Sequence, residues 1–247
     1  MKPSTAYSTK QNLSVLLVGE QKAGKTNIMF AFPDPYILDC DRNLARAVRV
    51  SGGKKFWFDD PYVDDKGQPL AEKDLWNNAV KCLKEAAKSP EVRTICIDGL
   101  AALADMLIAH ILAEALRNEG KKLDRMRIQD YQPLKTLMTS LVLGLRSTGK
   151  YLVVTSHQKT DKDELTGRIR YTLNMPGSLS ENFGGFFTDV WAAVSRPGPS
   201  GTLYELHTRP TGYHVNLGTT LQLDGKPLDV SNKNPEQVWA TLAPHIT

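Results

Sequence analysis

One stretch decides the fold of this 247-residue chain: Gly19-Glu20-Gln21-Lys22-Ala23-Gly24-Lys25-Thr26. An apolar run at residues 13–18 precedes it, and residues 27–31 continue it, which predicts the order strand, loop, helix. Two glycines bound the loop, and a lysine and a threonine follow the second, which is the spacing of a phosphate-binding P-loop. In such a loop the backbone N–H groups and the helix N-terminus face an anion. We therefore expect the chain to bind a nucleoside triphosphate.

The last side chains of this loop have separate predicted roles. Lys25 can reach the β- and γ-phosphates, and the Thr26 hydroxyl can ligate Mg²⁺. ATP and Mg²⁺ are accordingly the expected cofactors. The predicted nucleotide-binding residues are Gly19, Glu20, Gln21, Lys22, Ala23, Gly24, Lys25, Thr26 and Asn27.

A second landmark is the apolar run at residues 94–98, which ends on an acid, Asp98. In P-loop proteins an acid at this position lies beside the loop and holds Mg²⁺ through water. The alternative is that Asp98 caps the helix that begins near Leu100. The upstream P-loop favours the magnesium role, so we predict Thr26 and Asp98 as the metal-binding residues.

The composition bounds the class of protein. Hydrophobic residues make up 41% and charged residues 23% of the chain, which is ordinary for a globular protein with a full core. No apolar run approaches the ~20 residues that span a bilayer, and residues 1–12 are polar, unlike a signal peptide. The cysteines are odd in number, which indicates reduced thiols and a cytoplasmic location. A net charge of +4 permits nucleic-acid binding without requiring it.

The order of elements predicts an α/β fold with a mostly parallel central sheet flanked by helices. Antiparallel strands are expected near the C-terminus, after a hairpin or loop at 159–176. We predict a flexible arm at residues 1–12 and a single domain at 13–247. The expected strands lie at 13–18, 36–38, 56–58, 94–98, 151–155, 190–195, 202–208 and 213–217. The expected helices lie at 27–31, 43–50, 71–88, 100–117, 131–148 and 235–242.

Together these landmarks resemble the RecA-like branch of P-loop ATPases. Within it the chain is most similar to small phage-encoded ATPases of the Sak type, which act in single-strand annealing and recombination. The resemblance covers roughly residues 12–220 and implies a RecA-like core, DNA-stimulated ATPase activity and, if phage-encoded, the cytoplasm of a bacterial host. The residues that carry it lie at 19–26, 36–41, 94–98, 153–158 and 183–194.

The resemblance also implies catalytic residues besides Lys25. Asp41 falls where the family has a carboxylate that polarises the attacking water, although most members carry the longer Glu. A turn or helix-capping role is the alternative for Asp41. His157 or Gln158 falls where the family has a polar residue that senses the γ-phosphate and relays its state to DNA. The alternative for either is a polar group that satisfies local backbone at the end of a strand.

The same resemblance implies contacts with other molecules. Single-stranded DNA is the expected partner, although the basic residues concerned are equally consistent with ordinary solvated charges. A homo-oligomer, as a ring or filament, is also implied, with Arg209, Arg196 or Lys159 acting on a neighbour's nucleotide. A single-strand-binding protein is a possible further partner. The candidate DNA-binding residues are Arg125, Arg127, Lys159, Lys162, Arg168, Arg170 and Tyr171.

Two other functional classes share the P-loop. A small-molecule or nucleotide kinase has the same loop and acid-ended strand, and Arg168 and Arg170 could belong to its lid. A nucleotide-gated interaction switch with little hydrolysis is the other alternative, and the short side chain of Asp41 suits it. Phosphate transfer to an acceptor would distinguish the kinase, and negligible turnover would distinguish the switch.

Overall fold

The computed structural model describes residues 13–120, 123, 125–162, 164, 167, 169–199, 201–214 and 216–246. The arm predicted at residues 1–12 and the DNA-binding candidate Arg168 lie outside these residues. Within the described chain, no helix is long and apolar enough to cross a membrane.

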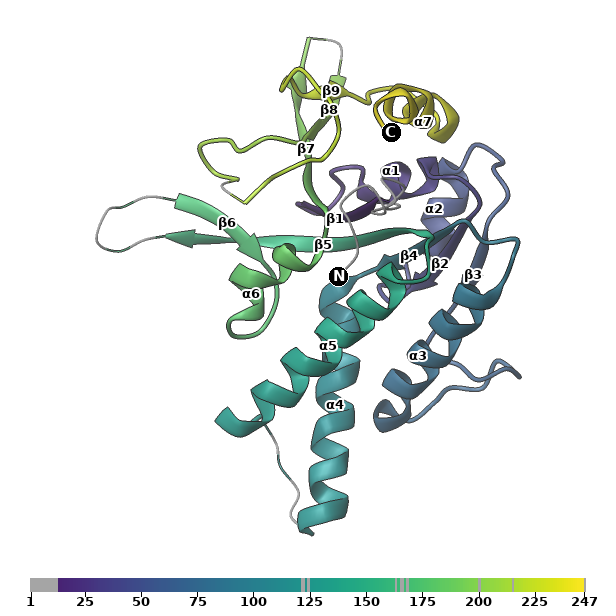
Figure 1. Cartoon of the computed structure of the whole chain (residues 1–247), viewed down its shortest axis with the longest axis vertical. Helices are drawn as coiled ribbons and strands as arrows, with labels where there is room; N and C mark the ends of the chain where they lie inside the picture. Colours follow the sequence, from purple (N-terminus) through teal and green to yellow (C-terminus); the bar gives the residue numbers. More distant parts are fainter. Residues whose placement is uncertain are drawn as a thin grey trace, which may run out of the picture.

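A nine-stranded sheet in the order β3-β2-β4-β5-β1-β7-β8-β9, with β6 paired to β5, organises the described residues (Figure 1). The pairs from β3 across to β7 are parallel, whereas β7–β8, β8–β9 and β5–β6 are antiparallel. The predicted fold class, a mostly parallel sheet with antiparallel C-terminal strands, is therefore confirmed. The strands are β1 (Ser14–Gly19), β2 (Pro35–Asp39), β3 (Trp57–Asp59), β4 (Thr94–Asp98), β5 (Tyr151–Lys162), β6 (Ile169–Leu173), β7 (Asp189–Gly198), β8 (Gly201–His207) and β9 (Leu228–Asp229).

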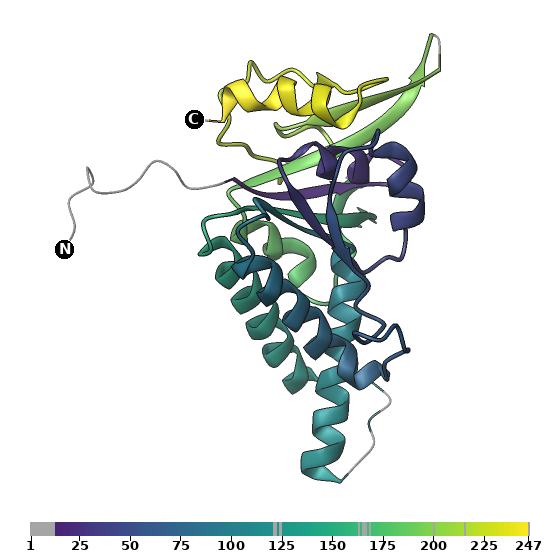
Figure 2. The same cartoon turned by 90° about the vertical axis from the view of Figure 1, so that its right-hand side faces the viewer.

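Helices cover both faces of this sheet, which makes three layers. Helices α1, α2 and α7 pack on one face, and α3, α4 and α5 pack on the other (Figures 1 and 2). The lower half of α4 extends beyond the sheet in both views. The α-helices are α1 (Lys25–Ala31), α2 (Leu44–Val50), α3 (Glu72–Lys88), α4 (Leu100–Glu119), α5 (Tyr131–Arg146), α6 (Leu179–Asn182) and α7 (Pro235–Leu242). Short 3₁₀ turns are η2 (Ile128–Asp130), η3 (Phe183–Phe186) and η4 (Ala243–His245).

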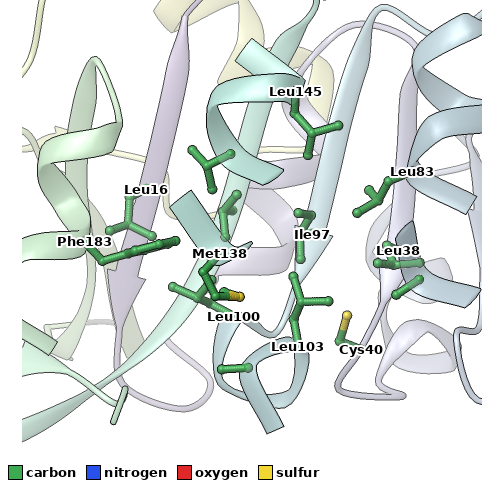
Figure 3. Packing of buried hydrophobic residues seen from close by; sticks show 14 of the residues in the cluster. Leu16, Leu38, Cys40, Leu83, Ile97, Leu100, Leu103, Met138, Leu145 and Phe183 are labelled. Atoms are coloured by element: carbon green, nitrogen blue, oxygen red, sulfur yellow. The ribbon is translucent and has the colours of Figure 1, made fainter. Parts of the chain in front are cut away.

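The two halves of the core follow from the alternation of side chains along β1. Leu16 and Val18 join the cluster beneath α3, α4 and α5, part of which Figure 3 shows, with Leu16 near Phe183. Val15 and Leu17 join the cluster beneath α1 and α7. Because both faces are covered, every residue of β1 is buried and the strand reads as a continuous apolar run. That packing fixes the end of β1, from which the P-loop starts.

Three of the differences from the predicted elements concern strands. Strand β5 continues to Lys162 and forms a hairpin with β6, so the predicted hairpin is confirmed but the strand leading to it is longer. The strand predicted at 213–217 is wrong: Tyr213 O accepts a hydrogen bond from Tyr171 N, and Gly218 forms an isolated bridge with Val190. The short strand β9 was not predicted.

Candidate nucleotide-binding site

The P-loop lies at the C-terminal edge of the parallel sheet, between β1 and α1. A Cβ at Gly19 would lie 2.4 Å from the backbone oxygen of Ala193, so β7 approaches too closely for any side chain there. Gly24 has a φ of 88°, in the region that favours glycine, and precedes the first residue of α1. The two glycines that bound the loop are thus required by its neighbours and by its backbone.

Lys25 is buried and turns back onto its own loop. Its Nζ donates to Gly19 O at 2.9 Å and to Glu20 O at 2.7 Å, and it lies 3.3 Å from His157 Nδ1. Burial lowers the pKa of Lys25 to about 8, against the opposing influence of nearby carboxylates, Asp98 first among them. A lysine held this way has two carbonyl partners that phosphate oxygens can replace.

Asp98 is a buried carboxylate whose two oxygens face different partners. Thr155 Oγ1 donates to its Oδ1 at 2.6 Å, and Thr26 Oγ1 donates to its Oδ2 at 3.4 Å. Burial raises the pKa of Asp98, and the hydrogen bond from Thr155 opposes that rise. One carboxylate oxygen therefore converges with the Thr26 hydroxyl beside the P-loop.

This pair of oxygens fits a magnesium ion. Mg²⁺ prefers hard oxygen ligands and takes one or two from the protein, the rest coming from water and substrate phosphates. Among the described residues, no group of three or more His, Cys, Asp or Glu side chains could hold a metal on its own. Thr26 and Asp98 are the residues that would hold it.

Asp41 is positioned by the turn that follows β2. The backbone N–H groups of Cys40 and Asp41 both donate to Asp98 O, at 3.0 and 3.1 Å, which fastens this turn to the end of β4. A Cβ at Gly99 would lie 2.3 Å from Asp41 Oδ1, so the carboxylate rests against a position that must be glycine. Asp41 Oδ2 lies 3.5 Å from His157 Nε2.

His157 and Gln158 point to opposite faces of β5 because side chains alternate along a strand. His157 pairs with Gly19 in the β1–β5 register and lies between Lys25 and Asp41. A neutral ring satisfies both neighbours if Nδ1 accepts from Lys25 and Nε2–H faces Asp41. Gln158 instead accepts a hydrogen bond from His214 Nε2 at 3.0 Å, away from the P-loop. Of the two catalytic candidates, the site therefore includes His157 and excludes Gln158.

Three further residues border the site, and the sequence analysis did not identify them. Thr155 holds Asp98, Gly99 makes room for Asp41, and the ring of Tyr204 lies 3.4 Å from where a Cβ at Gly24 would be.

Beyond the loop, Asn27 Nδ2 donates to Lys233 O at 3.4 Å, and Asn27 Oδ1 is buried with no partner among the described residues. The C-terminal strands and the segment before α7 therefore border the P-loop. Two sequence features could have indicated Thr155 and Gly99: a polar residue within the predicted strand at 151–155, and a glycine directly after Asp98.

Most candidate DNA-binding residues lie on the β5–β6 hairpin, apart from the P-loop. Lys159 and Lys162 are exposed on β5, whereas Arg170 pairs with Asp161 and Glu181 at 2.9 and 3.1 Å. The half-buried ring of Tyr171 packs on His214, with 4.7 Å between ring centroids.

The remaining candidates lie on other elements. Arg127 donates to the carboxylate of Asp130 at the start of α5, so it has a structural role there, while Arg125 is exposed. On the C-terminal hairpin, Arg196 donates to Glu205 at 2.6 Å, and Arg209 is exposed beyond β8. The structure brings neither arginine to the P-loop of its own chain.

A glycine-bounded loop between a buried parallel strand and a helix, with a buried lysine and a carboxylate beside it, defines the P-loop class of nucleotide-binding proteins. Residues 11–201 match the model of the AAA domain family, and the chain belongs to that family. It is a P-loop ATPase domain.

Comparisons with individual proteins add little to this assignment. No curated protein matches the chain. Among solved structures, a KaiC-like protein from the hyperthermophilic archaeon Pyrococcus horikoshii OT3 is similar, with 14% identity and a TM-score of 0.48. That alignment covers 91% of this chain and 88% of the other.

Proposed function

We propose that this protein is a Mg²⁺-dependent ATPase that acts on single-stranded DNA in recombination, by annealing or strand exchange. The observation that carries the ATPase part of the proposal is the convergence of Lys25, Asp98 and Asp41 beside the P-loop, with His157 between Lys25 and Asp41. A phosphate-binding cation, a carboxylate for the metal and a second carboxylate for water are the groups that ATP hydrolysis requires.

In the proposed reaction, water attacks the γ-phosphorus of ATP while the bond from that phosphorus to the bridging oxygen breaks. ADP and inorganic phosphate are the products, and Asp41 accepts a proton from the water. Lys25 exchanges its two loop carbonyls for phosphate oxygens, and His157 holds the Asp41 carboxylate in place. Bound Mg²⁺, held by Thr26 and through water by Asp98, would neutralise phosphate charge.

The path of β5 supports coupling to DNA. The strand runs without a break from His157 to Lys162, so the residue that contacts Lys25 and Asp41 lies on the same element as two exposed lysines. Exposed lysines can bind the phosphates of a single strand without reading its sequence. If nucleotide binding moves His157, the movement would therefore be transmitted along β5 to the β5–β6 hairpin.

We also propose that the protein assembles into a ring or filament on DNA and that an arginine acts in trans. Arg209 is the better candidate, because it is exposed and forms no ion pair within the described chain. Arg196 is the weaker one, since its guanidinium is already paired with Glu205.

The test is ATP turnover with Mg²⁺, with and without single-stranded DNA, on the wild type and three variants. Lys25→Ala should abolish turnover, and Asp41→Asn should lower it by about 10²- to 10⁴-fold while ATP binding persists. The exposed acid Asp224 supplies the control, since Asp224→Asn should leave turnover unchanged. Full turnover in Lys25→Ala would refute an ATPase at this site, and turnover indifferent to DNA would favour the kinase or the switch.

A further inference from the structure

A pocket lies on the face of the sheet opposite helix α1. Its floor includes Leu16 and Val18, which belong to the half of the core beneath α3, α4 and α5. Its walls come from β5, β6 and the chain after β8, and include Gln158, Tyr171 and His214. About 420 Å³ of space, part of it open solvent at the mouth, lies between these walls. Figure 1 shows the β5–β6 hairpin, which supplies part of these walls, leaving the sheet beside α6.

Apart from Glu181, the polar side chains that line this pocket are uncharged. His214 Nε2 donates to Gln158 Oε1 at 3.0 Å and its Nδ1 lies 3.4 Å from Thr211 Oγ1, an arrangement that a neutral imidazole satisfies. Burial lowers the pKa of His214 to about 4, so it is neutral at pH 7. Glu181, at the rim, is paired with Arg170. A pocket of this kind favours an uncharged ligand over a phosphate or a carboxylate.

The pocket also offers hydrogen-bond donors and an aromatic wall. Within the described residues, no hydrogen bond uses the Gln158 NH₂ group, so it can donate to a ligand. Tyr171 lines the pocket, whereas Tyr213, whose ring centroid is 6.0 Å from that of Tyr171, does not. The apolar floor, the aromatic ring of Tyr171 and the amide donor of Gln158 together suit a planar heterocycle that has carbonyl or ring-nitrogen acceptors.

We propose that this pocket takes one unstacked base of a single DNA strand whose phosphates lie along the β5–β6 hairpin. The inference rests on the proposed function and deepens it by assigning where a base is held. Lys159 follows Gln158 directly and is exposed. A single DNA strand can therefore place a phosphate beside Lys159 and a base beside Gln158. Because His157 precedes Gln158, the base would lie one residue from a side chain that contacts Lys25.

The test compares two fluorescently labelled strands of equal length and charge, an oligothymidylate and its fully abasic counterpart, by anisotropy. The wild type should bind the base-bearing strand about tenfold or more tightly, the size of a stacking contact. Tyr171→Leu and His214→Leu should remove that preference, and Tyr213→Leu, which changes the neighbouring exposed ring, should keep it. Asn216→Trp, on the exposed rim, should also remove it by filling the mouth without touching the core.

The outcomes separate this proposal from the proposed function. If Tyr171→Leu and Tyr213→Leu lose the preference for the base-bearing strand equally, the bases stack on the surface of the protein, and the pocket proposal is overturned. A base preference that survives both His214→Leu and Asn216→Trp would also overturn the pocket. Equal binding of the two DNA strands by the wild type would overturn it as well. A wild type that binds neither strand would instead overturn single-strand binding itself.

Discussion

Lys25 is a lysine whose charge depends on pH in an accessible range, because burial lowers its pKa to about 8. Bound polyphosphate stabilises the ammonium and raises that pKa again, so binding above pH 8 takes up a proton. The affinity for ATP should therefore be constant below about pH 7 and fall by up to tenfold per unit above about pH 8. Titration with a fluorescent ATP analogue across this range measures the effect.

The control for this prediction is Lys25→Arg, because a guanidinium stays protonated throughout the range. Its affinity should be lower than that of the wild type but independent of pH. A wild-type affinity that stays constant from about pH 7 to 10 would contradict a pKa of about 8 for Lys25.

Gly99 should control turnover through Asp41. A Cβ there would meet Asp41 Oδ1 at 2.3 Å, so Gly99→Ala must displace the carboxylate, and its φ of 109° adds strain. Because misplacement of a reacting group by about 1 Å can cost ~100-fold, turnover should fall at least tenfold while ATP affinity changes little. Gly67→Ala is the matched control, since Gly67 also has positive φ but no atom near its Cβ position. Equal turnover in the two variants would contradict the assignment.

Part of this site was accessible from the sequence because parallel strands end at one edge of a sheet. That rule brings the end of β1 and Asp98 together without knowledge of side-chain contacts. It could not separate His157 from Gln158, since the choice depends on the phase of β5 relative to β1. It also could not identify Thr155 or Gly99, whose roles follow from contacts with residues far away in the chain.

At the scale of the element, helix α1 has an unusual C-terminal cap. Lys54 Nζ donates to the carbonyl oxygens of Phe30, Ala31 and Phe32, at 2.8, 3.0 and 2.7 Å. A cation at this end of a helix satisfies free carbonyls and complements the helix dipole. Lys54→Met should therefore lower the free energy of unfolding by about 1–3 kcal/mol, measured by urea denaturation. Lys84→Met, at an exposed position of α3, should change it by less than about 0.5 kcal/mol.

The elements that were predicted best are those with strong local signals. Strand β4 and helix α7 match their predicted bounds, because an apolar run or a capping asparagine and proline mark them. Residues 156–162 lacked such a signal because they are polar: Ser156 is still buried beside β1, and the strand continues from there into the hairpin. Residues 213–217 looked strand-like, but the hydrogen bonds of Tyr213 and Gly218 go to two different elements.

For the whole molecule, the cysteines should report global unfolding. Cys40, Cys82 and Cys96 are all buried, and burial raises the pKa of Cys82 to about 11 and those of the other two well above their usual value. The thiolate is the reactive form, so Ellman's reagent should react with the native protein only as fast as it unfolds. All three thiols should react at once in guanidinium. Rapid reaction of one thiol in the native protein would show that an opening smaller than global unfolding exposes it.

The order of the sheet has a consequence for how the chain is made. Ser14 pairs with Leu152 and Val15 with Asp189, so strand β1 leaves the ribosome long before its partner strands β5 and β7. Until then an apolar strand has two open edges, which invites aggregation and chaperone binding. Contacts this distant in sequence also slow folding. The newly made chain should therefore acquire the capacity to bind nucleotide only after β5 and β7 have been synthesised.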